Sequence, residues 1–139
     1  MPQLAKPNDL TWLLNDVVSR VPALLNAVVL SDDGLLMAAD GGLRQETAEH
    51  LAACASGYQS LSRSAGGAFE GGPIRQTVVE MTTRFLFITS AGNRSCLAVL
   101  CTSDADVGLI AYEMAVLVKQ VHASLSTSPR PGVPAGDAS

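Results

Sequence analysis

The chain has 139 residues, of which 47% are hydrophobic and 16% charged, and its formal net charge is −4. This length accommodates one domain with an apolar core, and the absence of a Lys/Arg cluster argues against nucleic acid or an anionic membrane surface as a partner. A surface this poor in charge is more typical of a protein with a permanent interface than of a solitary monomer.

The first part of the sequence predicts a helix followed by a β-hairpin. Asn8 or Asp9 can cap the helix, whose apolar residues repeat with helical spacing until Pro22 ends it. The apolar segment Leu24–Ser31 predicts a strand that is covered on both faces. An Asp-Asp-Gly turn then leads into a return strand over Leu35–Ala39.

The segment from about Ala48 to Ala65 predicts a helix with two distinct faces. We expect one face to cover the sheet, and it consists of Ala48, Leu51, Ala52, Ala55 and Tyr58, with Cys54, Leu61 and Ala65 on its flank. The opposite face carries a seam of small residues, Ala53, Gly57, Ser60 and Ser64. Gly57 destabilises a helix interior by about 0.5–1 kcal/mol relative to Ala. We interpret the seam as a contact for a second helix, and the alternative is a weak, solvated helix.

Three strands follow, over Ile74–Met81, Phe85–Ser90 and Ser95–Thr102, and short turns make them an antiparallel meander. The meander leaves one side of its first strand unpaired. An exposed edge of this kind is normally protected from pairing with another chain by Pro or by charged side chains. We therefore expect this strand to pair with its copy in a second chain. The residues assigned to that interface are Arg75, Thr77 and Val79.

A last helix is predicted from about Asp106 to Leu125, which completes an α+β domain with a five-stranded antiparallel sheet and helices on both faces. This domain covers residues 8–125, after a flexible N-terminus over residues 1–7. Residues 126–139 contain Pro129, Pro131 and Pro134 with few large apolar residues, and we interpret them as a disordered tail.

The sequence carries no recognisable catalytic motif, since the P-loop, the G-x-S-x-G elbow and H-E-x-x-H are all missing. His50 and His122 are far apart, and neither has a cysteine or a second histidine at the spacing of a metal site. We therefore predict no enzyme activity, no cofactor and no metal.

The cysteines and the apolar runs predict a cytoplasmic protein without membrane insertion. Cys96 and Cys101 are five positions apart in one predicted strand, so they should point to opposite faces and cannot bridge. We expect both, and Cys54, to be reduced. The N-terminus MPQLAKPNDL has no apolar signal core, and no run approaches the ~18 apolar residues of a membrane span.

Apolar side chains also fall opposite the predicted core stripes of the first and last helices. They are Trp12 in the first helix and Leu109, Tyr112 and Val116 in the last. The two helices could share these residues along their flanks, or the residues could anchor a partner protein.

Segments in order along the chain resemble the bacterial Roadblock family, named after a dynein light chain. They are DLTWLLNDVVSRVP, AVVLSDDGLLMAAD, ETAEHLAACASGYQSLSRSAGG, RQTVVEM and ADVGLIAYEMAVLVKQV. The closest resemblance is to actinobacterial members encoded in conservon operons. It implies a profilin-like sheet in the order 2-1-5-4-3 and a homodimer in which the central helices lie antiparallel and the third strands pair.

The same resemblance implies a function. Its members are non-enzymatic regulators or scaffolds of a small Ras-like GTPase, and the gliding-motility relatives accelerate GTP hydrolysis by positioning the GTPase's own residues. A membrane sensor-kinase-like protein and a small helical protein are the other implied partners. The GTPase contacts are implied on the side of the central helix that carries Glu49, Ser56 and Arg63.

Two other functions compete with this interpretation. A sensory domain of the profilin/PAS-like kind would hold a small ligand between the sheet and a helix, and a closed apolar core would argue against it. A small hydrolase would need paired catalytic groups, which the sequence does not provide.

Overall fold

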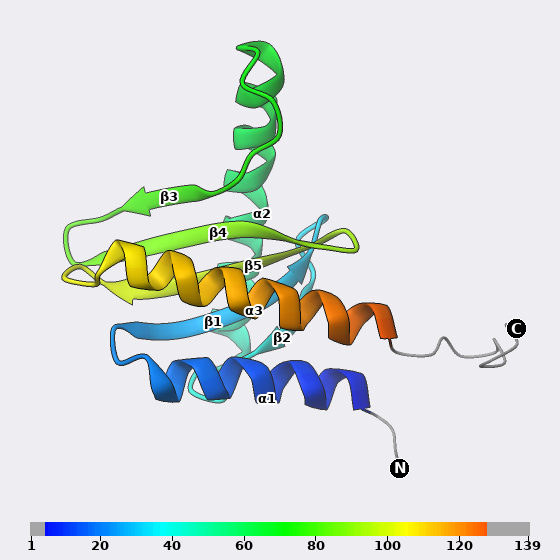
Figure 1. Ribbon diagram of the computed structural model, residues 1–139, viewed down its shortest axis with the longest axis vertical. Coiled ribbons are helices and arrows are strands. Elements are labelled where there is room, and N and C mark those ends of the chain that lie inside the picture. The colour runs from blue at the N-terminus through cyan, green and yellow to red at the C-terminus, as the bar shows by residue number, and fades with distance from the viewer. Residues whose placement is uncertain (1–4, 128–139) are drawn as a thin grey trace, which may run out of the picture.

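The chain folds into an antiparallel five-stranded sheet with helices on both faces (Figure 1). The computed structural model describes residues 5–127. In chain order the elements are α1 (Ala5–Arg20), β1 (Leu24–Ser31), β2 (Leu36–Ala39), α2 (Gln45–Ala68), β3 (Thr77–Glu80), β4 (Arg84–Gly92), β5 (Ser95–Thr102) and α3 (Val107–Thr127). The strand order is β2-β1-β5-β4-β3, which confirms the order implied by the resemblance.

The most apolar strands, β1 and β5, lie next to each other inside the sheet, as predicted. Val28 pairs with Ala98 and Leu30 pairs with Cys96 across the two strands. All four of these residues are buried, because helices cover both faces of the sheet here.

Alternation along β5 divides the interior into two layers. Leu97, Val99 and Cys101 pack with α1 and α3 on one face, whereas Cys96 and Ala98 pack under α2 on the other. Cys96 and Cys101 therefore point to opposite faces, as predicted, and both are free thiols.

The turns β1–β2 and β4–β5 meet at one end of the sheet. Gly34 has a φ of +90° in the first turn, a conformation that favours glycine. The N–H of Asp32 donates to the carbonyl oxygen of Arg94 in the second turn, at 3.0 Å. This contact fixes two segments, which are distant in sequence, beside the same flank of α2.

Several predicted boundaries are wrong. α1 begins at Ala5, so neither Asn8 nor Asp9 caps it and the segment 1–7 is helical from Ala5 onward. Pro7 is compatible with this start, because proline is tolerated in the first turn of a helix. The other residues of the segment 1–7 lie outside the described part of the chain.

The predicted tail also begins too early, because α3 continues to Thr127. The side-chain amide of Asn93 donates to Ser126 Oγ at 3.0 Å, which ties the end of α3 to the β4–β5 turn. The other residues of the predicted tail 126–139 lie outside the described residues. Within residues 5–127, no helix is long and apolar enough to cross a lipid bilayer.

Candidate functional site

Helix α2 lies on its sheet with only part of the predicted apolar face. Its buried residues are Ala48, Ala52, Ala55, Gln59 and Gly66. The predicted positions of Tyr58, Leu61 and Ala65 are wrong, because all three side chains are exposed. The cause is visible in Figure 1, where the C-terminal part of α2 extends past the β3 edge and has no sheet beneath it.

Exposed apolar side chains gather on one flank of α2 and at its C-terminal end. We call Tyr58, Leu61, Ala65 and Phe69 the apolar flank of α2. Leu61 is 71% exposed and Phe69, the residue that caps the helix, is 81% exposed. Their spacing of three to four residues places them on one side of a helix. The sequence analysis placed Tyr58 on the face that covers the sheet and Leu61 and Ala65 on the flank of that face, and it missed Phe69.

The seam of small residues is exposed along its length. Ala53, Gly57, Ser60 and Ser64 all lie on the surface. A Cβ atom built on Gly57 would have no heavy atom within 4 Å. The seam therefore has room for a second backbone, and it lies beside the apolar flank.

Strand β3 forms one edge of the sheet, as predicted. Thr77 and Val79 face the α2 layer, where the Thr77 hydroxyl donates to Gln59 Oε1 at 3.2 Å and Val79 packs on the apolar core. Arg75 is not part of the strand, which corrects the predicted start at Ile74. Its carbonyl oxygen accepts a hydrogen bond from the Thr89 hydroxyl at 3.0 Å in place of a regular ladder bond.

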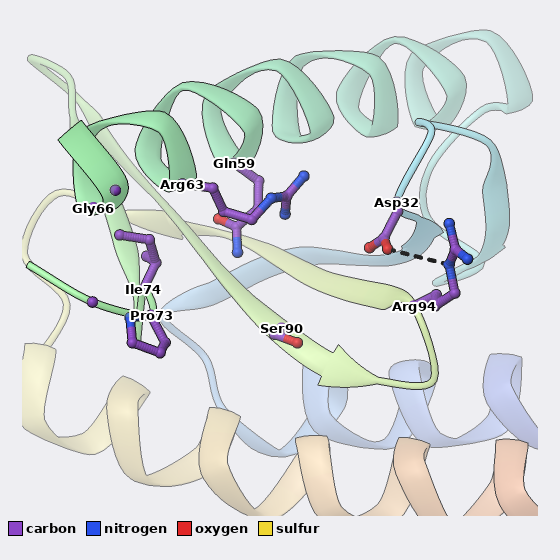
Figure 2. Close-up of a pocket in the computed structure, with 10 residues that line it drawn as sticks. Asp32, Gln59, Arg63, Gly66, Pro73, Ile74, Ser90 and Arg94 are labelled. Carbon is purple, nitrogen blue, oxygen red and sulfur yellow. Dashed lines mark ion pairs between the residues drawn. The ribbon is translucent and has the colours of Figure 1, made fainter.

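The three polar residues assigned to a partner lie on the flank of α2 opposite the apolar flank. Ser56 is half-buried, and its hydroxyl donates to the Asp32 carbonyl oxygen at 3.2 Å. Glu49 is exposed and accepts a hydrogen bond from the Gln45 amide at 2.8 Å. Arg63 lies nearer the C-terminal end of α2, where it lines a cleft beside the β1–β2 and β4–β5 turns (Figure 2).

The apolar residues of α1 and α3 do not form one patch. Trp12, Leu109 and Tyr112 are exposed, while Val116 is half-buried. Arg20 pairs with Glu113 at 3.5 Å, which aligns the end of α1 with the first turns of α3. Trp12 is eight residues before Arg20, or about 12 Å along the helix, so it lies apart from Leu109 and Tyr112.

One contact between a histidine and a cysteine was missed by the sequence analysis. His50 Nε2 and Cys54 Sγ are 3.7 Å apart on successive turns of α2. The i, i+4 spacing was the available signal. No group of three His, Cys, Asp or Glu side chains capable of holding a metal occurs within residues 5–127.

The two buried thiols are held in their neutral form. Burial raises the pKa of Cys101 to about 11. Burial and the Asp32 carboxylate also raise the pKa of Cys96, while the charge and hydrogen bond of Arg63 oppose this shift. Because the thiolate is the nucleophile, these residues are suited to packing rather than to covalent chemistry.

Comparison with known proteins agrees with this architecture. A family model of the Roadblock/LC7 domain matches residues 10–101. A solved Roadblock/LC7 domain from Streptomyces avermitilis is 49% identical, with a TM-score of 0.81 over 86% of this chain and 99% of that one. No curated protein matches the chain.

More distant structures share the fold alone. Myxococcus xanthus MglB is 13% identical, with a TM-score of 0.80 over 94% of this chain and 98% of that one. Acanthamoeba castellanii profilin II is 11% identical, with a TM-score of 0.56 over 80% of this chain and 97% of that one. Together with the family model and the S. avermitilis relative, the strand order and helix layers lead to one conclusion: the chain belongs to the Roadblock/LC7 family.

Proposed function

We propose that the chain is a non-enzymatic homodimeric adaptor that regulates a small Ras-like GTPase. Two observations carry the proposal: the exposed seam of α2, which lies beside an apolar flank, and the open edge of the sheet at β3. Large apolar side chains in a contiguous exposed group are typical of protein interfaces. Family membership supplies the expected class of partner.

The dimer contact follows from where α2 ends. Its C-terminal part extends past β3 (Figure 1), so a second copy at the same edge would receive the helix over its own sheet. Two antiparallel α2 helices would then bury the seam and the apolar flank, and the paired β3 strands would continue the sheet. One solved MglB structure, 12% identical to this chain, is described as having a tetrameric arrangement, which supports self-association as a property of the fold.

The proposed setting is a conservon signalling complex in the cytoplasm of an actinobacterium, with a membrane sensor-kinase-like protein as a further partner. The similarity to Streptomyces domains supports this setting. The proposed regulation includes acceleration of GTP hydrolysis by the GTPase's own residues.

The GTPase is proposed to dock on the polar flank of α2. Glu49→Lys combined with Arg63→Glu reverses two charges on that flank. We expect affinity for the GTPase to fall about tenfold or more, because complementary charges steer and orient a partner. Affinity is measured by titration after circular dichroism has established that the variant is folded.

Trp12→Ala is the matched control, since Trp12 is exposed on the opposite side of the sheet. This substitution should leave GTPase affinity unchanged. If Trp12→Ala abolishes binding while the double charge reversal does not, the GTPase docks on the α1/α3 side and the assignment to α2 is wrong.

A further inference from the structure

A cleft of about 640 Å³ lies between the C-terminal half of α2, the chain leading into β3, and the two sheet turns (Figure 2). Its lining residues are Asp32, Gln59, Arg63, Gly66, Gly67, Gly72, Pro73, Ile74, Ser90 and Arg94. This volume is in the range of about 300–1,000 Å³ that is typical of small-molecule sites. Through Arg63 the cleft adjoins the polar flank of α2, opposite the apolar flank.

Two arginines give the cleft a local positive charge in an otherwise acidic chain. Arg94 pairs with Asp32 at 3.7 Å, and its side chain remains 88% exposed. Arg63 forms no ion pair with a carboxylate anywhere in residues 5–127; its neighbour is the buried Cys96 thiol. Figure 2 shows Arg63 extending from α2 toward the side where Asp32 and Arg94 lie. One positive charge is left without a counter-charge.

A side-chain amide adds a neutral donor to the cleft. Gln59 is only 3% exposed, yet it lines the cleft. Its Oε1 accepts a hydrogen bond from Thr77 at 3.2 Å, which fixes the side chain, while its NH₂ group donates to no acceptor within residues 5–127. The NH₂ group is not a fully buried atom, so it is available to an acceptor in the cleft beside the two arginines.

Backbone hydrogen bonds between glycines fix the shape of one wall of the cleft. The N–H groups of Gly71 and Gly72 both donate to the carbonyl oxygen of Gly66, at 2.8 and 3.2 Å. A Cβ on Gly66 would lie 2.4 Å from the Gly72 oxygen, so glycine is required for this contact. Among the described lining residues there is no aromatic ring on which a nucleotide base could stack, and the site suits a small, charged group.

We propose that this cleft binds an oxyanion, a phosphate or carboxylate group, between the guanidinium groups of Arg63 and Arg94. The Gln59 amide and the Ser90 hydroxyl supply neutral donors beside them. Guanidinium groups bind both classes of oxyanion through charge-assisted hydrogen bonds. The anion comes either from a free small molecule or from an acidic side chain of a partner protein.

The test is an NMR titration of the full chain at constant ionic strength, with inorganic phosphate in one series and the peptide acetyl-Ala-Glu-Ala-amide in another. We expect saturable shifts of the Arg63 and Arg94 Nε–H signals and of the Gln59 amide, with Arg44 unchanged. The probe that saturates at the lower concentration identifies the source of the anion. Arg63→Gln should weaken the apparent affinity about tenfold.

Arg44→Gln is the matched control, because Arg44 is exposed at the opposite end of α2 and, among residues 5–127, forms an ion pair only with Glu46. Arg94→Gln tests the site again without altering a side chain of the helix. Equal shifts of the Nε–H signals of all arginines, including Arg44, would overturn the proposal. So would an affinity for both probes that stays unchanged in Arg63→Gln and in Arg94→Gln. The titration requires no GTPase, so its failure is separate from a failure of the proposed function.

Discussion

At the residue scale, Gly57 is the position on which the proposed dimer depends most. It lies in the middle of a 24-residue helix, where glycine is unfavourable by roughly 0.5–1 kcal/mol relative to Ala. Nothing in the described part of its own chain explains this cost, because a Cβ there would meet no heavy atom within 4 Å. Close packing of a second helix at this position would explain why residue 57 is a glycine, without a side chain.

Gly57→Leu should therefore weaken dimerisation while leaving the fold intact. The leucine side chain would hold the two α2 helices apart and expose the apolar flank of each again. We expect the dimer dissociation constant, measured by sedimentation equilibrium, to rise at least about tenfold, equivalent to roughly 1.4 kcal/mol.

Gly57→Ala is the matched control. It improves helix propensity at the same position, but its single methyl group adds far less bulk between two helices than leucine does. An equal effect of both substitutions would point to the helix and not to the interface. A monomeric parent chain would remove the basis of the proposal.

Residue positions on α2 could be predicted from the sequence only in part. The periodicity correctly places Ala48, Ala52 and Ala55 on the sheet, because small apolar residues recur with helical spacing. It fails for Tyr58 and Leu61, since periodicity cannot tell a side chain over the sheet from one beyond its edge. Gln59 is buried because it accepts a hydrogen bond from Thr77, a contact between segments that helical spacing does not reveal.

At the element scale, β3 is short and carries the open edge of the sheet. The N–H of Met81 donates to the Arg84 oxygen at 2.8 Å, closing the hairpin to β4. Hydrogen bonds alternate along an antiparallel pair, so the N–H groups of Val78 and Glu80 point to the unpaired side. Neither a proline nor a bulge interrupts these four residues to protect the edge.

We expect the amides of Val78 and Glu80 to exchange slowly in the parent dimer, because the partner's β3 accepts their hydrogen bonds. In the Gly57→Leu monomer the same amides should exchange at least tenfold faster, while Phe87 in the interior of the sheet stays protected. The measurement is hydrogen–deuterium exchange followed by NMR. Rapid exchange of both amides in the intact dimer would mean that the strands do not pair.

Elements were predicted more accurately than their ends. The order of helices and strands is as predicted, and β1 and β5 have the predicted bounds, because both are continuous apolar runs between turn residues. The start of β3 was placed too early, since a run of alternating residues continues through Arg75 although the ladder does not. The cleft could not be predicted, because Arg63 and Arg94 come from segments that only the tertiary fold brings together.

At the scale of the whole molecule, the sheet separates two surfaces with different proposed roles. On the α2 side, the seam and the apolar flank are proposed to serve the second copy, and the polar flank carries the cleft. On the α1/α3 side, Trp12 and Tyr112 remain exposed but lie apart, so they do not form a single anchor. In the proposed assembly, this division would let one dimer hold its partner proteins on separate surfaces.

The central claim is that the protein recognises a GTPase without binding its nucleotide. Isothermal titration calorimetry of the full chain tests it directly, with GTP, GDP and a nucleotide-loaded small Ras-like GTPase from the same cell as successive ligands. We predict that neither free nucleotide gives more binding heat than inorganic phosphate does, and that the GTPase gives a saturable heat. Saturable binding of GTP or GDP that inorganic phosphate does not reproduce, or no heat with any GTPase, would contradict the account.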